Sequence, residues 1–285
     1  MKRILVTGAN GQLGNCLKDL SKKEKDLDFV FTDKETLDIT NPALVKTFFE
    51  ENTFDYCINT AAYTHVDKAE REAEQAFRVN AEGVKHLSEA CAQNQVTLLH
   101  ISTDYVFDGT KQTPYTEDDE PHPINVYGAS KLKGERYIKE ICEKYFIVRT
   151  SWLYSQYGHN FYKSITKLAE ERETLTITTE QTGCPTNAND LAKVLLEIVE
   201  SENKAFGIYH YSNEGETTWF GFAKAIVEFS GLSNQVKVVE TDYYPTFAKR
   251  PVYSLLDTKK IKNCKNVNNE AWQRSLKKLL EKQKN

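Results

Sequence analysis

The chain of 285 residues is long enough for one large domain or two closely packed ones. Apolar residues make up 40% and charged residues 27%, a balance typical of soluble globular proteins, and the formal net charge of -4 excludes a broad basic face. We therefore expect no nucleic acid and no membrane as a partner, and no apolar run approaches the ~18–20 residues of a membrane span.

The cysteines are scattered, without a C-x-x-C pair or paired histidines, so neither a disulfide framework nor a zinc site is predicted. The apolar run at the N-terminus is too short for a signal peptide. We expect reduced thiols and a cytoplasmic protein. The six cysteines are Cys16, Cys57, Cys91, Cys142, Cys184 and Cys264.

The first predicted strand, Ile4 to Val6, is followed at once by three glycines with the spacing G-x-x-G-x-x-G, from Gly8 to Gly14. A continuously apolar run is typical of a strand buried on both faces of a parallel sheet. The glycines permit a tight turn, and the helix after them offers free N–H groups and its positive dipole end. This placement between strand and helix predicts dinucleotide binding.

A second strand, 29–33, ends in Asp33, about 20 residues beyond the glycine loop. A carboxylate at this position can accept hydrogen bonds from the adenosine ribose. Asp33 would repel a 2′-phosphate and so favours NADH, but the adjacent Lys34 could relieve the repulsion, which leaves NADPH open. The alternative is that Asp33 only begins a turn. A helix capped by Thr40 or Asn41 follows, and it is predicted to end at Glu51.

A third buried strand, 56–59, leads into small residues that would let a cofactor lie against the backbone, and a helix is predicted from about 72 to 93. His65 is interpreted as a loop residue near the site, since no nucleophile motif accompanies it. The fourth strand, 97–103, is predicted to continue through 104–109. Its end places Ser102, Thr103 and Asp104 at the cleft, where a hydroxyl can hold a substrate oxygen.

Tyr127 and Lys131 lie one turn apart on a predicted helix that follows the fourth strand. A positive charge beside a tyrosine lowers the pKa of the phenol from its usual value of about 10, so such a tyrosine can exchange a proton with a substrate. The spacing alone could arise by chance on an exposed helix. Its position downstream of a dinucleotide loop makes it the predicted reaction centre.

A fifth strand is predicted at 145–150 and a sixth at 175–178. We expect an α/β fold, a Rossmann-type doubly wound parallel sheet in residues 1–150, with segments near 175–205 returning to it. Residues 151–285 would mainly form a smaller α/β substrate domain. There Trp152 could stack on a sugar or base, or be a core aromatic, and Arg250 could bind a substrate phosphate, or form a surface ion pair.

With these motifs in place, the chain resembles the dTDP-4-dehydrorhamnose reductases, a family of the extended short-chain dehydrogenases/reductases, over nearly its whole length. The matching stretches are Gly11–Gly14, Ala61–Glu70, Ser102–Phe107, Asn125–Lys131, Arg149–Trp152, Gln181–Thr186 and Arg250–Pro251 with Ser254 and Leu255. The resemblance implies three catalytic residues, Thr103, Tyr127 and Lys131. It implies substrate contacts from Thr103, Asp104, Tyr105, Trp152 and Arg250. The implied cofactor contacts are Gly8, Asn10, Gly11, Gln12, Leu13, Gly14, Asp33, Asp38, Ile39, Ala61, Ala62, Tyr63, Thr64, Tyr127 and Lys131.

The family's reaction is reduction of the C4 keto group of a dTDP-linked sugar by NADPH or NADH, with a small-molecule nucleotide sugar as the partner. One alternative is another nucleotide-sugar reductase or epimerase. A 4,6-dehydratase is disfavoured because its usual Asp-Glu pair is Asp104-Tyr105 here. The other is a non-catalytic NAD(P)-binding regulatory subunit. Some members bind magnesium at a dimer contact through an acid just past the glycine loop. Asn15 stands in that region here, so we predict no metal site and a monomer or weak homodimer.

Overall fold

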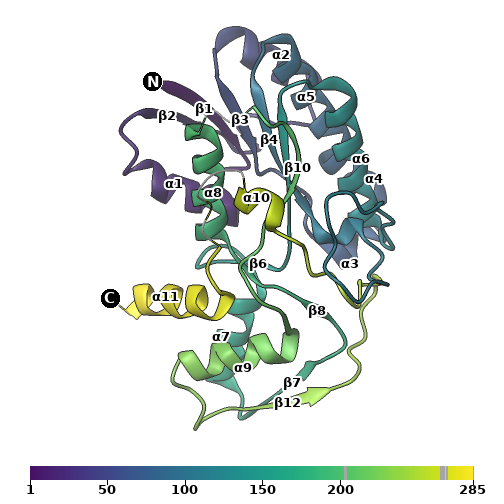
Figure 1. Ribbon diagram of the computed structural model, residues 1–285, viewed down its shortest axis with the longest axis vertical. Coiled ribbons are helices and arrows are strands. Elements are labelled where there is room, and N and C mark those ends of the chain that lie inside the picture. Colours follow the sequence, from purple (N-terminus) through teal and green to yellow (C-terminus); the bar gives the residue numbers. More distant parts are fainter. Residues whose placement is uncertain (202–203, 264–266, 268, 285) are drawn as a thin grey trace.

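The computed structural model describes residues 1–201, 204–263, 267 and 269–284. Its upper part is a six-stranded sheet in the order β10-β5-β4-β3-β1-β2, and every pairing within it is parallel (Figure 1). This order confirms the predicted doubly wound, Rossmann-type sheet. The strands are β1 (Lys2–Thr7), β2 (Leu27–Phe31), β3 (Tyr56–Asn59), β4 (Thr97–Thr103), β5 (Tyr145–Thr150) and β10 (Gly207–His210).

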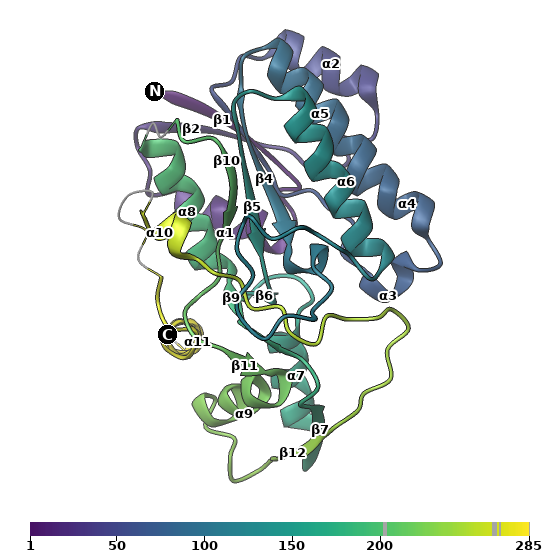
Figure 2. The same ribbon diagram turned by 45° about the vertical axis from the view of Figure 1, so that its right-hand side comes forward.

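Helices cover both faces of this sheet. On one face lie α1 (Gln12–Ser21) and α8 (Ala188–Glu200), and on the other α2 (Pro42–Glu51), α5 (Gly83–Gln93) and α6 (Val126–Ile141) (Figures 1 and 2). Successive side chains of β1 enter different cores, since Ile4 packs with α1 and α8 and Leu5 packs with α2 and α5. Burial on both faces explains why β1 reads as an uninterrupted apolar run.

Two predicted elements differ from the structure. The fourth strand ends at Thr103 and does not continue through 104–109, because the Thr103 hydroxyl caps a 3-10 helix, η2 (Asp104–Val106), by accepting from the Tyr105 N–H at 3.2 Å. The helix predicted over 72–93 contains a π-helical segment, η1 (Arg78–Glu82), between α4 (Ala73–Phe77) and α5. The short helix α3 (Val66–Ala69) precedes α4 in the chain.

The lower part has its own apolar core, in which aromatic rings from α7 (Phe161–Glu171), α9 (Trp219–Phe229) and α11 (Trp272–Lys284) meet. The strand predicted at 175–178, β7 (Thr174–Thr178), pairs here with β12 (Lys237–Thr241). By contrast, β10 is a strand of the large sheet and α8 packs on that sheet. The shorter elements are β6 (Leu153–Tyr154), β8 (Thr182–Gly183), β9 (Thr186–Asn187), β11 (Thr217–Thr218) and α10 (Lys259–Asn263).

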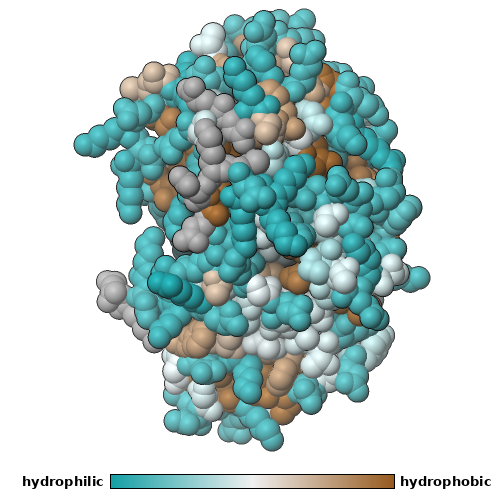
Figure 3. Space-filling view, viewed as in Figure 1, coloured by the Kyte–Doolittle hydropathy of each residue, from teal (hydrophilic) through white to brown (hydrophobic). Residues whose placement is uncertain are grey.

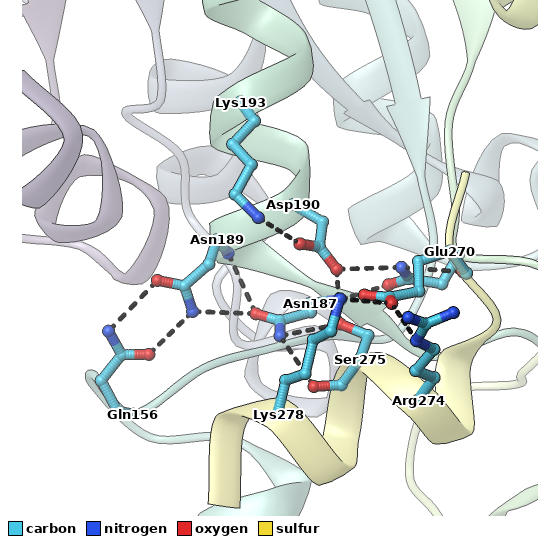
Figure 4. Close-up of polar contacts among 10 residues, drawn as sticks. Gln156, Asn187, Asn189, Asp190, Lys193, Glu270, Arg274, Ser275 and Lys278 are labelled. Carbon is cyan, nitrogen blue, oxygen red and sulfur yellow. Dashed lines mark hydrogen bonds and ion pairs between the residues drawn. The ribbon is translucent and has the colours of Figure 1, made fainter. Parts of the chain in front are cut away.

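Polar contacts connect α8 to α11 and thereby join the two parts (Figure 4). Asn187, which caps α8, donates to the Ser275 hydroxyl at 2.9 Å, and that hydroxyl donates to Asp190. Glu270, before α11, forms ion pairs with Arg274 at 2.9 Å and Lys278 at 2.5 Å. The contacts of Ser275 with Asn187 and Asp190 hold α11 against α8, whereas the Glu270 ion pairs join α11 only to the segment that leads into it.

On the face drawn in Figure 3, hydrophilic side chains predominate and hydrophobic ones form small separate groups. Among the described helices, none is both long and apolar enough to cross a membrane. The described cysteines are all buried and unpaired, as predicted: Cys16, Cys57, Cys91, Cys142 and Cys184. Cys264 lies outside the described residues.

Candidate active site

The glycine loop packs directly against the loop that follows β3. β1 and β3 are neighbours in the sheet, and the chain leaves β1 through Gly8 at φ +68°, a left-handed conformation that favours glycine. A Cβ on Gly8 would lie only 2.5 Å from the backbone nitrogen of Ala61, so a larger residue would separate the two loops. This is the edge of a doubly wound sheet where ligands bind.

A cavity of about 430 Å³ opens at this edge. Ten of the predicted cofactor residues line it: Gly8, Asn10, Gly11, Asp33, Asp38, Ile39, Ala61, Ala62, Tyr63 and Thr64. His65, which was expected near the site, also lines it. The sequence analysis did not single out Gln75 and Arg78, although both contribute to the wall. Gln75 lies in α4 and Arg78 begins the π-helical segment η1, and no sequence pattern marks either as part of the cavity wall.

Three other predicted cofactor residues, Gln12 to Gly14, form the first turn of α1 directly after Gly11 and are not among the residues that line the cavity. Leu13 is 4% exposed and packs in the core between α1 and α8. The side-chain oxygen of Gln12 accepts hydrogen bonds from Ser155 at 3.1 Å and Asn160 at 2.8 Å. Gly14 brings α1 close to the loop, because a Cβ there would be 2.6 Å from the Cα of Ala9. Gly14 thus provides the close packing of helix and loop that such a glycine permits, and the cofactor contacts of Gln12 and Leu13 stay predictions.

The far end of the cavity carries both signs of charge. Asp33 follows β2 and accepts hydrogen bonds from Thr36 and from the Asn10 amide at 2.7 Å, and these bonds, Thr36 foremost, lower the pKa of its carboxyl. Asp33 is therefore ionised at neutral pH. Lys34 and Arg78 line the same cavity, so it carries two cationic side chains as well as the Asp33 carboxylate.

Asn80, in the π-helical segment η1, links the cavity to α6. Its side-chain oxygen accepts from the Tyr63 N–H at 2.8 Å, and its amide donates to the Tyr63 carbonyl and to the Ser130 hydroxyl, each at 3.0 Å. One fully buried side chain thus fixes the cofactor-side loop against the helix that carries Tyr127. The sequence analysis missed Asn80. π-helical turns are frequent at functional sites, but the structure is needed to see one.

The predicted reaction centre forms where β4 ends beside the first turn of α6. Asn125 caps α6 by accepting from the Gly128 N–H at 2.7 Å. Gly128 permits a close approach, since a Cβ on it would lie 2.0 Å from the Tyr105 carbonyl oxygen. This contact brings Tyr127 within hydrogen-bond reach of Thr103, and the Tyr127 ring meets Tyr105 edge to face at 5.8 Å.

The pKa of Tyr127 shifts opposite to the prediction. Burial raises it to about 12, the hydrogen bond with Thr103 lowers it, and the nearby Asp104 carboxylate raises it further. Lys131 is 2% exposed, and its ammonium group points toward β4, where it donates to the Ile101 carbonyl at 2.6 Å. The prediction that Lys131 lowers the pKa of Tyr127 is therefore wrong for this structure, because the ammonium group is engaged behind the tyrosine.

Asp104 lies beside Tyr127 and is 2% exposed. Burial raises the pKa of its carboxyl to about 6, while hydrogen bonds from Ser254 and Thr103 act in the opposite direction. A carboxyl group that titrates near neutrality at the end of β4 is the kind of perturbed group that marks functional sites.

The comparisons with known proteins agree with this geometry. The family model described as the RmlD substrate binding domain matches residues 1–285. The chain belongs to this family. It is 42% identical to a dTDP-4-dehydrorhamnose reductase of Aggregatibacter actinomycetemcomitans, and the match covers 98% of each chain.

Solved structures give the same result. A dTDP-4-dehydrorhamnose reductase from Clostridium acetobutylicum is 38% identical, with a TM-score of 0.94, over 99% of this chain and 100% of the other. The Bacillus anthracis reductase, solved in complex with NADP, is also 38% identical, with a TM-score of 0.93, over 99% of each chain. The family is one of oxidoreductases that use NAD(P)H, so this member is an enzyme.

In this member of the RmlD family, Trp152 stacks on Trp219 at 3.7 Å with the rings 9° apart. Its backbone has φ +47°, which is uncommon for a residue other than glycine and marks local strain. Trp152 is only partly buried. Its contact with Trp219 fits the interpretation of Trp152 as a packed aromatic, and its stacking on a sugar or base stays a prediction.

Arg250 pairs with Asp67 through two hydrogen bonds of 3.1 and 2.8 Å. The Arg250 side chain is 17% exposed and also contacts the Tyr105 hydroxyl. The ion-pair reading of Arg250 thus describes its partner in the structure, while its role toward a substrate remains a prediction. Asp67, on α3, also accepts a hydrogen bond from the Ala248 N–H, so Asp67 connects the chain around Arg250 to α3.

Proposed function

We propose that this protein reduces the C4 keto group of dTDP-4-dehydro-β-L-rhamnose to give dTDP-L-rhamnose, with NADPH or NADH as hydride donor. The observation that carries the proposal is the Thr103–Tyr127 pair, joined through α6 and Asn80 to a cavity lined by ten predicted cofactor residues. The relatives named dTDP-4-dehydrorhamnose reductase support the choice of sugar nucleotide.

The dinucleotide would lie in the cavity with its diphosphate at the loop from Gly8 to Gly11. The two glycines have no side chains, so the diphosphate could approach the backbone there. When bound, its nicotinamide supplies the hydride. Thr103 holds the carbonyl oxygen of the sugar in place. Tyr127 donates its phenol proton to that oxygen as the alkoxide develops at C4, and Lys131 neutralises the phenolate that remains.

Asp104, Tyr105, Trp152 and Arg250 are proposed to bind the nucleotide sugar. Asp104 and Tyr105 directly follow Thr103 on η2, and Arg250 contacts Tyr105, so these three can act on one ligand. Trp152 offers an aromatic face from the loop after β5, and stacking on such a face suits a sugar or a base.

For the cofactor's adenosine end, the structure supports use of both forms. The ionised Asp33 can accept hydrogen bonds from a free 2′-hydroxyl, while Lys34 and Arg78 can bind a 2′-phosphate. We also propose a cytoplasmic protein that is a monomer or weak homodimer. The buried, unpaired cysteines fit a reducing compartment, and sedimentation velocity would measure the association state.

The test is the loss of NADPH or NADH absorbance when the dTDP-linked keto sugar is added. Tyr127→Phe should lower kcat by about 10²–10⁴-fold and leave the Kd of NADPH unchanged, because only the proton donor is removed. Tyr137→Phe is the matched control, since Tyr137 lies on the same helix and donates to Glu82 on the surface. No turnover by the unmodified enzyme, or full activity of Tyr127→Phe, would refute the proposal.

A further inference from the structure

A buried histidine lies directly behind Lys131. Nε2 of His100, on β4, is 3.3 Å from Nζ of Lys131, and Nδ1 is 3.0 Å from the Asn59 amide nitrogen. His100 is fully buried, Asn59 is 1% exposed and Lys131 is 2% exposed. Each polar atom in this group must therefore find its partner among its neighbours, so their hydrogen bonds determine where the protons are.

The orientation of Asn59 decides the tautomer of His100. The N–H of Ala61 points at Oδ1 of Asn59 at 3.1 Å, and a backbone N–H can only donate, so that atom must be the amide oxygen. The other atom, Nδ2, then donates to Nδ1 of His100, which must accept. A neutral imidazole that accepts at Nδ1 carries its proton at Nε2.

That proton faces the amine of Lys131. A charged ammonium group has donors only and cannot accept it, whereas a neutral amine has a lone pair that can. His210 shows the opposite arrangement. Its Nδ1 lies 3.0 Å from the Tyr115 carbonyl and must donate, which leaves Nε2 free to accept from the Arg149 guanidinium at 3.4 Å. His210 can thus accept from a permanent cation, whereas His100 is oriented to donate to an amine without its extra proton.

We propose that His100 is a positioning residue that donates from Nε2 to the neutral form of Lys131 and so favours loss of the lysine proton beside the reaction centre. The inference deepens the proposed function and rests on it for its catalytic meaning. Burial lowers the pKa of Lys131 to about 8, close to neutral pH, so a small change in its surroundings alters the fraction of the amine that is charged. The pKa of His100 is lowered by burial and by Lys131, so the imidazole stays neutral.

The other groups near Lys131 act differently. Glu135, one turn further along α6, raises the pKa of Lys131, but its carboxylate is already bound by Arg149 from β5 and by Ser102 from β4. Tyr127, one turn before Lys131 on α6, is neutral because its pKa is raised. His100 is thus the neighbour whose hydrogen bond distinguishes the two forms of the amine. In its ammonium form Lys131 carries the proton that would pass to the Tyr127 phenolate in the proposed reaction, and the His100 bond to the neutral amine eases that release.

The experiment measures the titration of Lys131 by NMR of its side-chain Cε signal, assigned with Lys131→Arg, in the purified protein without added cofactor. Asn at position 100 keeps a polar partner for Asn59 but does not reach Nζ, so His100→Asn should raise the pKa of Lys131 by about one unit, a roughly tenfold change in proton affinity. His100→Gln, whose amide oxygen can accept from the ammonium group, should raise it as well and serves if the first variant fails to fold.

His210→Asn is the matched control, because it removes a buried histidine from β10, which β5 separates from β4, without touching Lys131. It should leave the Lys131 titration unchanged. An unchanged pKa in both His100 variants, or an equal rise in His210→Asn, would overturn the inference. Because this measurement needs no turnover, its failure is distinct from a failure of the proposed reaction, which the keto-sugar assay tests.

Discussion

The buried ion pair beneath the reaction centre is expected to be a major determinant of stability. Arg149 is 2% and Glu135 is 1% exposed, and two hydrogen bonds join them, from Nη2 at 2.6 Å and from Nε at 3.0 Å. Glu135→Ala would leave the guanidinium buried without its carboxylate. Removing one partner of such a pair costs about 3–5 kcal/mol in the free energy of unfolding. For 285 residues this corresponds to a fall of roughly 5–8 °C in Tm.

Urea and thermal unfolding followed by circular dichroism would measure this loss. The comparison is the double variant Glu135→Leu with Arg149→Met, which removes both charges and keeps apolar volume. It should recover most of the lost stability, because the penalty comes from the unpaired charge and not from the missing bond. A loss below about 1 kcal/mol in Glu135→Ala, or a double variant as unstable as the single one, would refute this reasoning.

Three further predictions concern the site. Lys34→Ala and Arg78→Ala should each raise KM for NADPH about tenfold and leave KM for NADH nearly unchanged, which steady-state kinetics with both cofactors would check. Asn80→Ala should cost about 1–3 kcal/mol of stability, measured by urea unfolding, and raise KM for cofactor, because the Tyr63 backbone loses its partner. Asp104 has a raised pKa in the fold, so the folded state binds its proton more tightly. Asp104 therefore contributes up to about 3 kcal/mol to the free energy of unfolding. This contribution is present below pH 3.8 and is lost as pH rises through about 6. Asp104→Asn should flatten that slope in unfolding measurements across this range.

The sheet could be predicted from the sequence because its signals are local. The apolar runs at β1, β3, β4 and β5 report burial on both faces, and the glycine loop reports the close contact between Gly8 and Ala61. The order of strands follows from the rule for doubly wound folds. The same local logic predicted a cap at Thr40 or Asn41, of which the structure has Asn41, and the end of α2 at Glu51.

The rest of the site depends on contacts between distant residues. Leu13 was assigned to the cofactor from its place in a motif. Its side chain packs in the core between α1 and α8, and its contact with the cofactor stays a prediction. The pairing of β7 with β12 joins segments about 60 residues apart, which no local pattern specifies. Likewise, Asn80 bonds to Tyr63 and Ser130 and His100 to Asn59 and Lys131, all distant in the sequence, so nothing near Asn80 or His100 marks them.

The shift of the Tyr127 pKa bears on the direction of the proposed reaction. A tyrosine with a lowered pKa would be partly ionised at rest and could act as a base, as an oxidation requires. With its pKa raised to about 12 by burial, Tyr127 keeps its proton throughout the neutral range. A reduction needs a loaded proton donor at the moment the hydride arrives. The electrostatics of this centre therefore suit reduction of a ketone, and Lys131, whose amine donates to the Ile101 carbonyl on β4, is proposed to act on the phenolate once it has formed.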